Sequence, residues 1–427
     1  MTSLAYDTDR ETAPTGNPAK AAPLDSYRPI PRVSIHAFCE TDSVAQAMSR
    51  ANADRRMART HLEIHTGGID EAVRTYQSSS TPSLIIVETS VQPHDVLGEL
   101  SKLAAVCDPS SKVVVIGHHN DVWLYRELMR NGISEYVVAP VTLSDVIGLI
   151  SGIFNEPGAA PLGRSIAFVG AKGGVGASTI AHNVGWSISN LFRSEVVIAD
   201  MDLPYGTANI NFDQDPTQGI AEAVFSPERI DEVYLDRLLA QCAENLSLLA
   251  APSTLERAFD FREDAFSSLI DVAQRSVPHV ILDVPHSWNG WTRTTLFQAD
   301  EVVIVATPEL ANLRNAKNLL DTLKQMRPND APARLILNQV GIPKRPEISV
   351  SDFCEPLGIE SLAVIPFDPA LFGNAANNGR MLGETEPSNV VVQHIKDVAH
   401  VLTGRTEMRA TKKAGLTGIF SKLKLKK

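Results

Sequence analysis

The sequence lacks the usual features of a secreted or membrane-spanning protein. Its four cysteines are widely separated and form no CxxC pair, so we expect free thiols in a reducing compartment. No apolar run reaches the ~18–20 residues that a membrane-spanning helix needs, and the N-terminus holds no apolar signal core. The net charge of −11 argues against a nucleic-acid-binding body. We therefore expect a cytoplasmic protein, and its 427 residues suggest about two or three domains.

The acidic charge is unevenly spread along the chain. Residues 405–427 contain eight Lys or Arg and one Glu, a net charge of +7, whereas the rest of the chain carries −18. In this tail Leu416, Ile419, Phe420 and Leu423 fall at i, i+3, i+4 and i+7, which predicts a basic amphipathic helix. Such a helix suits an anionic membrane surface. A disordered solubilising tail and a helix that docks on a partner protein are the alternatives.

Short apolar runs alternate with helical stretches in the first third of the chain. Residues 1–31 are rich in Pro, Ala, Thr and Asp and predict a disordered leader. Residues 32–154 predict an α/β, doubly wound domain in which strands alternate with helices. Its predicted strands are 32–38, 61–66, 83–89, 112–117 and 135–140.

A second α/β domain follows a short linker. Residues 155–163 contain Pro, Gly and Ala without periodicity, which is typical of an interdomain linker. Residues 164–404 contain about seven short apolar runs, most of them separated by helical segments, which predicts a larger doubly wound parallel sheet.

The segment AKGGVGAST, residues 171–179, lies between a predicted strand and a predicted helix. Its glycines let backbone N–H groups curl around phosphates, and the following helix N-terminus favours negative charge. The usual form of this loop ends in Gly-Lys-Ser/Thr. Here Ala177 stands where that lysine belongs, and a different lysine, Lys172, opens the loop. A tight turn that only packs helix on strand is the alternative.

Acidic residues follow later strands, at the end where doubly wound sheets bind ligands. Asp200 and Asp202 end one predicted strand, and Asp283 ends another. Carboxylates there can hold Mg²⁺ and can orient an attacking water, and the hydroxyl of Ser178 is a further Mg²⁺ ligand. We therefore predict a nucleotide site whose metal ligands are Ser178, Asp200 and Asp283.

These motifs resemble the MinD/ParA family of deviant P-loop ATPases, over residues 164 to about 400. The family's loop reads Lys-Gly-Gly-x-Gly-Lys-Thr/Ser, and its first lysine reaches across a nucleotide-sandwich dimer to the partner's phosphates. The resemblance gives this role to Lys172. It places Asp200 and Asp202 in the first switch and Asp283 in the second. It implies ATP and Mg²⁺ as cofactors, an ATP-dependent homodimer, and Lys172 and Asp202 as catalytic residues.

The same resemblance assigns the remaining nucleotide contacts. Ala177 removes the lysine that each subunit uses on its own phosphates, and losing one such contact typically slows a reaction by ~10²–10³. Asn338 and the segment 365–380 resemble the family's adenine-recognition segments. The predicted nucleotide-binding residues are Lys172, Gly173, Gly174, Val175, Gly176, Ala177, Ser178, Thr179, Asn338, Pro366 and Asp368.

The first domain resembles a response-regulator receiver without its chemistry. Glu88 stands in place of the phosphoacceptor Asp, and Ala139 replaces the receiver's lysine. The receiver's usual acidic pair after the first strand is reduced to Glu40 and Asp42. A carboxylate one methylene longer, without its lysine, is not expected to accept phosphate. We therefore interpret residues 32–154 as a pseudo-receiver that docks partners.

A degenerate receiver joined to such an ATPase resembles the TadZ/CpaE family. This implies an ATP-binding, dimerising localisation or scaffold factor for a Flp (tight adherence, type IVb) pilus or related secretion machinery, with weak or no ATP hydrolysis. It implies assembly proteins as partners of the pseudo-receiver and a polar position at the inner face of the cell membrane. One alternative is an active partition or MinD-type ATPase that positions cargo on membrane or nucleoid, although the acidic body argues against DNA. A phosphorelay regulator is the other, and Glu88 and Ala139 argue against it.

Overall fold

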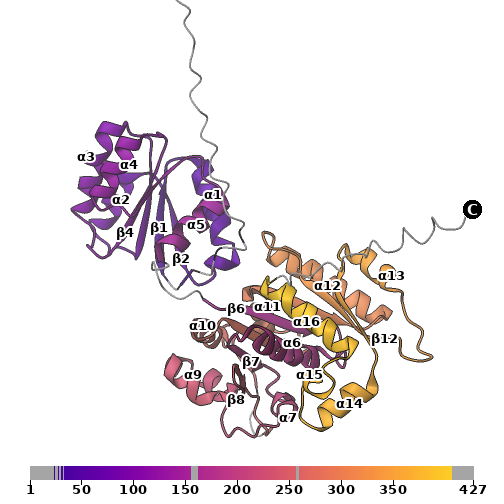
Figure 1. Ribbon diagram of the computed structural model, residues 1–427. Coiled ribbons are helices and arrows are strands. Elements are labelled where there is room, and N and C mark those ends of the chain that lie inside the picture. The colour runs from indigo at the N-terminus through magenta and orange to yellow at the C-terminus, as the bar shows by residue number, and fades with distance from the viewer. Residues whose placement is uncertain are drawn as a thin grey trace, which may run out of the picture. The chain divides into compact units, whose positions relative to one another are not determined.

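The computed structural model describes residues 24, 27, 30, 31, 33–154, 162–255 and 259–405. The chain divides into two compact units, one formed by residues 1–160 with 324–331 and the other by residues 161–323 with 332–427. Each unit is a sheet with helices on both faces (Figure 1). The predicted linker and tail lie outside the described residues, apart from residues 162, 163 and 405.

The described part of the first unit has five parallel strands in the order β2-β1-β3-β4-β5. Strands and helices alternate along the chain, as the sequence predicts. The strands are β1 (Ser34–Cys39), β2 (His61–Thr66), β3 (Leu84–Thr89), β4 (Lys112–Gly117) and β5 (Glu135–Val138). The helices are α1 (Asp42–Asn52), η2 (Arg55–Met57), α2 (Ile69–Tyr76), α3 (Pro93–Ala104), α4 (Val122–Arg130) and α5 (Leu143–Phe154).

Helices cover both faces of this sheet. One face carries α1 and α5, which pack around Met48 and Ile147, and the other carries α2, α3 and α4, which pack around Tyr76 and Leu100. The central strand β3 is buried throughout, which explains its continuous apolar run LIIV. The sheet core therefore follows directly from the apolar runs in the sequence.

Some of the described residues before the predicted boundary at residue 32 pack on the first unit. Ile30 is 1% exposed, lies in the core, and its N–H donates to Arg56 O (2.8 Å). Tyr27 lies so close to α5 that a Cβ on Gly148 would be 2.7 Å from its ring. The prediction of a disordered leader through residue 31 is wrong at its end, because single apolar anchors are hidden in a polar, Pro-rich stretch.

Residues 324–331 group with the first unit although they are distant in sequence. Asp330 is buried and accepts hydrogen bonds from Arg56 (2.8 Å) and Arg327 (2.8 Å). Arg55 also pairs with Asp330. These charges are buried together and satisfy one another, as buried charges must. No local sequence pattern predicts this placement.

The described part of the second unit has eight strands in the order β13-β12-β11-β6-β10-β7-β9-β8. All neighbours are parallel except β8, which pairs antiparallel with β9 at the edge. The sequence predicts about seven strands and misses β8, which has four residues and no marked apolar alternation. The strands are β6 (Arg164–Gly170), β7 (Val196–Asp200), β8 (Ala240–Ala243), β9 (Leu246–Leu249), β10 (His279–Val284), β11 (Glu301–Ala306), β12 (Arg334–Val340) and β13 (Ser361–Pro366).

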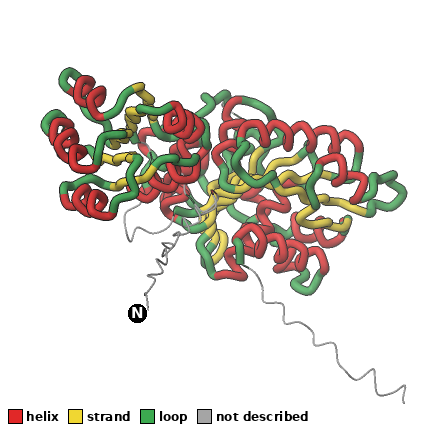
Figure 2. The backbone as a smooth tube through the Cα atoms, turned by 90° about the horizontal axis from the view of Figure 1, so that it is seen from above, coloured by secondary structure: helices red, strands yellow, loops and turns green. Residues whose placement is uncertain are grey.

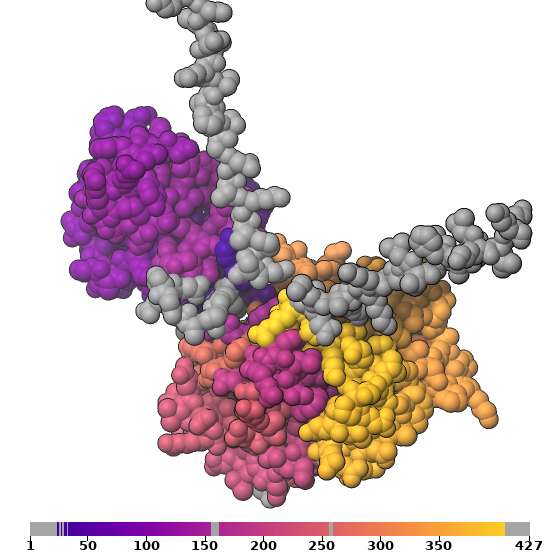
Figure 3. Space-filling model, in the orientation of Figure 1, coloured from indigo at the N-terminus to yellow at the C-terminus, as the bar shows by residue number. Residues whose placement is uncertain are grey.

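The helices of the second unit lie on the two faces of this sheet, outside the yellow strands in Figure 2. The helices are α6 (Ala177–Phe192), α7 (Ala208–Asn211), α8 (Ile220–Phe225), η3 (Pro227–Arg229), α9 (Glu232–Leu238), α10 (Ser267–Ser276), α11 (Gly290–Gln298), α12 (Leu310–Met326), α13 (Val350–Cys354), η4 (Glu355–Leu357), α14 (Pro369–Asn377), α15 (Leu382–Thr385) and α16 (Val390–Thr403). One face carries α6 and α16, which meet on the surface in Figure 3.

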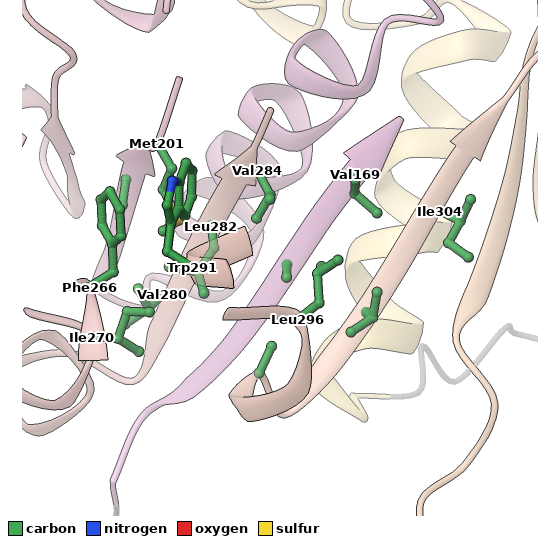
Figure 4. Packing of buried hydrophobic residues seen from close by; sticks show 14 of the residues in the cluster. Val169, Met201, Phe266, Ile270, Val280, Leu282, Val284, Trp291, Leu296 and Ile304 are labelled. Atoms are coloured by element: carbon green, nitrogen blue, oxygen red, sulfur yellow. The ribbon is translucent and has the colours of Figure 1, made fainter. Parts of the chain in front are cut away.

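The other face of the sheet carries α10, α11 and α12. There the ring centroids of Phe266 and Trp291 lie 4.6 Å apart, in the same apolar cluster as Leu282 and Val284 on β10 (Figure 4). This packing anchors β10 in the sheet. It thereby fixes the position of Asp283, which belongs to the same strand.

Candidate functional site

The glycine-rich loop and the predicted acidic residues meet at one edge of the second sheet. β6 ends at Gly170, β7 ends at Asp200, and β10 carries Asp283 one residue before its end. These strands are parallel neighbours in the order β6-β10-β7, and Asp200 is in register with Asp283. Ligands bind at this end of open α/β sheets, where the strand order reverses.

The loop 171–176 makes a tight turn between β6 and α6. Gly174 and Gly176 have φ values of 79° and 86°, in the left-handed region that favours glycine. A Cβ on Gly176 would lie only 2.6 Å from Nδ2 of Asn338, so a side chain would collide there. Ala177 is the first residue of α6. The glycines are thus required by backbone geometry and by close approach.

Amide side chains hold the carbonyl oxygens of this loop. The pairs are Asn315 Nδ2 to Ala171 O (2.9 Å), Gln339 Nε2 to Gly174 O (3.0 Å) and Asn338 Nδ2 to Val175 O (2.8 Å). Within the described ranges, the N–H groups of residues 172–176 donate no hydrogen bond. Unpaired N–H groups beside a helix N-terminus form a nest that suits phosphate oxygens.

Lys172 reaches from the loop to the residue before α12. Its Nζ donates to Glu309 Oε1 at 2.9 Å, and the two side chains are 51% and 34% exposed. Asn312 donates to the same oxygen at 2.6 Å. The hydrogen bond from Lys172 holds the pKa of the Glu309 carboxyl below its usual range. In the single chain, Lys172 is therefore neutralised by its own subunit.

Asp283 is the centre of a small hydrogen-bonded cluster. Its Oδ1 accepts from Ser178 Oγ at 3.1 Å, and its Oδ2 lies 3.1 Å from His182 Nε2. Ser178 and His182 are one helical turn apart on α6 and so face the same strand. His182 is 1% exposed. The structure thus brings together two of the predicted metal ligands and adds an imidazole.

Asp200, the third predicted metal ligand, is buried beside this cluster. Its oxygens accept N–H bonds from Asp202 (3.2 Å) and Ala208 (3.0 Å). Burial and the neighbouring Asp283 carboxyl raise the pKa of Asp200 well above the usual range of an aspartate. Crowded carboxylates with a nearby hydroxyl are the donor set of a hard divalent cation such as Mg²⁺. Since both Asp200 oxygens already accept an N–H, this residue fits a ligand that acts through water.

Asp202, predicted as catalytic, is half-buried just after β7. Its Oδ1 accepts from the N–H of Tyr205 at 3.3 Å, and burial raises its pKa. The predicted base contacts lie at the other side of the loop. Asn338 is buried on β12 and donates to the loop, and Asp368 caps α14 by accepting from Leu371 N (3.0 Å). The roles of Asn338, Pro366 and Asp368 toward a base stay predictions.

Sequence reasoning missed Glu309, His182 and Gln339. The spacing of His182 from Ser178 on one helix could have indicated its position. Gln339 has a φ of 55°, which is uncommon outside glycine and typical of constrained functional sites. Its contact with the loop depends on β12 lying two strands from β6, which no local pattern reveals.

Residues 163–334 match the family model of the AAA domain. A ParA family ATPase from Chlorobium tepidum is 26% identical with a TM-score of 0.51, covering 56% of this chain and 98% of that one. The second unit has the MinD/ParA-like P-loop NTPase fold. The septum site-determining protein MinD of Synechocystis is 25% identical over 252 residues, which are 57% of this chain and 91% of MinD.

The pilus assembly protein CpaE from Caulobacter crescentus is similar to the N-terminal part of the chain. It is 45% identical, covers 30% of this chain and 98% of CpaE, and has a TM-score of 0.30.

Glu88, predicted from the sequence to stand where a receiver has its phosphoacceptor, is enclosed by hydrogen bonds. It is fully buried, and its Oε2 accepts the N–H groups of Glu40 (2.7 Å) and Thr41 (2.8 Å). Its Oε1 accepts from Thr41 Oγ1 (2.7 Å) and lies 3.0 Å from His118 Nε2. The carboxylate is therefore occupied by its own domain.

Proposed function

We propose that this protein is a nucleotide-controlled localisation or scaffold factor for assembly of a Flp (type IVb) pilus or related secretion machinery. The second unit binds Mg-ATP, and two copies pair through the bound nucleotide. The observation that carries this proposal is the single lysine of the loop. Lys172 is half exposed and held by Glu309, while Ala177 offers no charge to the phosphates of its own subunit.

Each part of the site has one task in nucleotide binding. The N–H groups of residues 172–176 hold phosphate oxygens. Ser178 and Asp283, with Asp200 through water, would hold Mg²⁺, which would supply positive charge beside the phosphates. Lys172 leaves Glu309 and contacts the partner's nucleotide, so that binding and dimerisation are coupled.

The same arrangement makes hydrolysis slow. The lysine absent at Ala177 would stabilise charge on the transferred phosphoryl group, and losing such a contact typically costs ~10²–10³ in rate. Asp202 remains as the residue that orients an attacking water. A site of this kind binds and holds ATP longer than an ordinary P-loop ATPase, which suits a scaffold.

The proposed role in pilus assembly rests on the combination of these two units in one chain. A receiver whose phosphoacceptor position is filled by an enclosed Glu88 serves as a docking module for assembly proteins. The relatives described above match different units: the pilus assembly protein matches the first, and MinD and ParA match the second. The net negative charge of the chain outside residues 405–427 disfavours transport on DNA, because DNA binding needs Lys and Arg to neutralise phosphates.

Membrane contact through residues 405–427 belongs to the same proposal. In the part of the chain that the structure describes, no helix is long and apolar enough to cross a membrane. One basic amphipathic helix binds anionic lipid weakly, whereas two on a dimer bind far better, because the second attachment is intramolecular. Liposome co-sedimentation of the full chain and of a chain ending at Gly404, with and without Mg-ATP, tests this. Equal lipid binding by both chains contradicts it.

The function is tested by measuring ATP binding, ATP turnover and self-association on one purified sample. The proposal predicts binding and dimerisation with little turnover. Rapid turnover would instead favour the alternative function, that of an active partition or MinD-type ATPase. Absence of ATP binding contradicts both.

A further inference from the structure

A cluster of metal-ligating side chains lies at the edge of the first sheet, in the unit that does not hold the nucleotide loop. His36 is on β1, and Glu63 and His65 are on the neighbouring edge strand β2 (Figure 1). His36 is in register with Glu63, and residues two apart on a strand share a face. We propose that His36, Glu63 and His65 bind a divalent transition-metal ion of the zinc type.

The distances within the cluster already fit such an ion. Glu63 Oε2 lies 3.7 Å from His36 Nε2 and 3.5 Å from His65 Nε2. A tetrahedral ion with bonds of about 2.0–2.1 Å separates its ligand atoms by about 3.4 Å. One ligand atom from each of the three residues lies within 4.8 Å of the others. Small side-chain rotations therefore suffice to complete the site.

Both imidazoles are positioned by their surroundings. His36 Nδ1 hydrogen-bonds the hydroxyl of buried Tyr76 at 3.0 Å, which leaves Nε2 toward Glu63. A hydrogen bond on the second ring nitrogen is the usual support of a metal-bound histidine. The His65 ring stacks on Phe38 with centroids 4.8 Å apart. Its Nε2 is buried and has no hydrogen-bond partner among the described residues.

A buried ring nitrogen without a hydrogen bond is costly unless a ligand or cation satisfies it. An ion between His65 Nε2 and Glu63 Oε2 removes that cost and neutralises the carboxylate. One ion thus accounts for two features of the cluster, the orphaned nitrogen of His65 and the carboxylate oxygen of Glu63 that faces two imidazoles.

His61 extends the cluster without joining the first three ligands. Its Nε2 lies 3.0 Å from Glu63 Oε1, the oxygen that does not face the other two imidazoles. Its side chain is 75% exposed. We assign to His61 the role of a positioning residue that holds the carboxylate. Glu63 is 44% exposed, so water can supply further ligands.

The donor set determines the class of ion. Two imidazoles and one carboxylate suit Zn²⁺ and similar first-row ions, whereas Mg²⁺ and Ca²⁺ prefer oxygen ligands alone. Because the ligands come from β1 and β2, the ion ties the edge strand to the body of the sheet. An edge strand held in this way is less available for pairing with another chain.

The experiment uses the full, tag-free chain with Co²⁺ and then Zn²⁺, in excess Mg²⁺ so that oxygen-only sites are saturated. We expect one Co²⁺ per chain with visible ligand-field bands of low coordination number, displaced by Zn²⁺. His36→Gln, Glu63→Gln and His65→Gln each weaken binding by about 100-fold or more, and His61→Gln by about 10-fold. His94→Gln, which removes an exposed histidine paired with Asp95 on α3, leaves binding unchanged.

Thermal unfolding of the same proteins provides a second readout. Zn²⁺ raises the Tm of the wild type and of His94→Gln, and does not raise that of His65→Gln, while circular dichroism verifies that the variants are folded. Co²⁺ bands that persist in His36→Gln and His65→Gln overturn the proposal. So does the absence of saturable binding by the wild type at micromolar metal.

Discussion

Lys172 Nζ lies 2.9 Å from Glu309 Oε1, so the lysine proposed to bridge two subunits is held in the single chain by its own carboxylate. The pair must separate before Lys172 can contact a partner's nucleotide. Glu309→Gln keeps an oxygen but removes the charge. Half-exposed ion pairs are worth about 0.2–1 kcal/mol, and each dimer must separate two of them, so this change should strengthen the ATP-dependent dimer roughly 2–30-fold. Sedimentation equilibrium with Mg-ATP measures the effect.

The matched control for this prediction is Glu301→Gln. Glu301 pairs with Arg334 at 2.8 Å at the opposite end of β11, so the same chemical change is made away from the loop. Its dimer affinity should equal that of the wild type. Weaker dimers in Glu309→Gln would mean that Glu309 positions Lys172 for the partner instead of withholding it.

Ala177→Lys should accelerate ATP hydrolysis by more than about 10-fold, because it restores a cation at the phosphates of the same subunit. Ala177 is half-buried as the first residue of α6, beside the nest of loop N–H groups. Steady-state phosphate release measures the rate. Ala177→Met is the control, since it adds a similar length without charge and should leave turnover low. If both variants hydrolyse ATP at the wild-type rate, the slow chemistry has another cause, such as the position of Asp202.

Glu88 should accept no phosphoryl group from acetyl phosphate. Its carboxylate is fully buried and accepts hydrogen bonds from Glu40 N, Thr41 N and Thr41 Oγ1. Mass spectrometry after incubation should show no phosphoryl adduct, and Glu88→Gln should bind ATP as the wild type does. A phosphoryl adduct that forms on the wild type and is lost in Glu88→Gln would show that the first unit is a working receiver.

His279 should make the protein sensitive to mild acid. Burial, with Arg405 and Arg164 nearby, lowers its pKa from 6.5 to about 4. Because the pKa of His279 is lower in the folded protein than in the unfolded chain, neutral His279 contributes fully to the free energy of unfolding above pH 6.5. This contribution is lost as the pH falls through 4. The free energy of unfolding should therefore drop across this window by up to about 3 kcal/mol.

Urea unfolding at a series of pH values measures this effect. His279→Gln removes the titration and should flatten the curve between pH 6.5 and 4. Ser194, whose hydroxyl lies 3.1 Å from His279 Nδ1, can still bond a glutamine amide there. A variant whose stability falls as steeply as that of the wild type would refute the assignment to His279.

The sequence predicted the two α/β units because apolar runs and helical periods alternate with few exceptions. The loop, Asp200 and Asp283 could be predicted to meet because parallel strands place their carboxyl ends at one edge. The contacts that could not be predicted join residues distant in sequence. Gln339 contacts Gly174 across two strands, and Asp330 is buried against Arg56.

Two further features could not be predicted because the local sequence pattern is too weak. The edge strand β8 has four residues, and Ile30 is a single apolar anchor in a polar segment. The pattern His61-x-Glu63-x-His65 is visible in the sequence, and the spacing shows that all three share a face. That His36 joins them depends on the register between β1 and β2, which only the folded sheet reveals.

The central claim is that Lys172 couples nucleotide binding to dimerisation, and sedimentation of Lys172→Ala with Mg-ATP tests it most directly. Lys317→Ala, which removes another half-exposed lysine ion-paired to Asp321 on α12, is the control. The account predicts that the wild type and Lys317→Ala form dimers with Mg-ATP and that Lys172→Ala stays monomeric. Equal dimer fractions in the wild type and Lys172→Ala would contradict it.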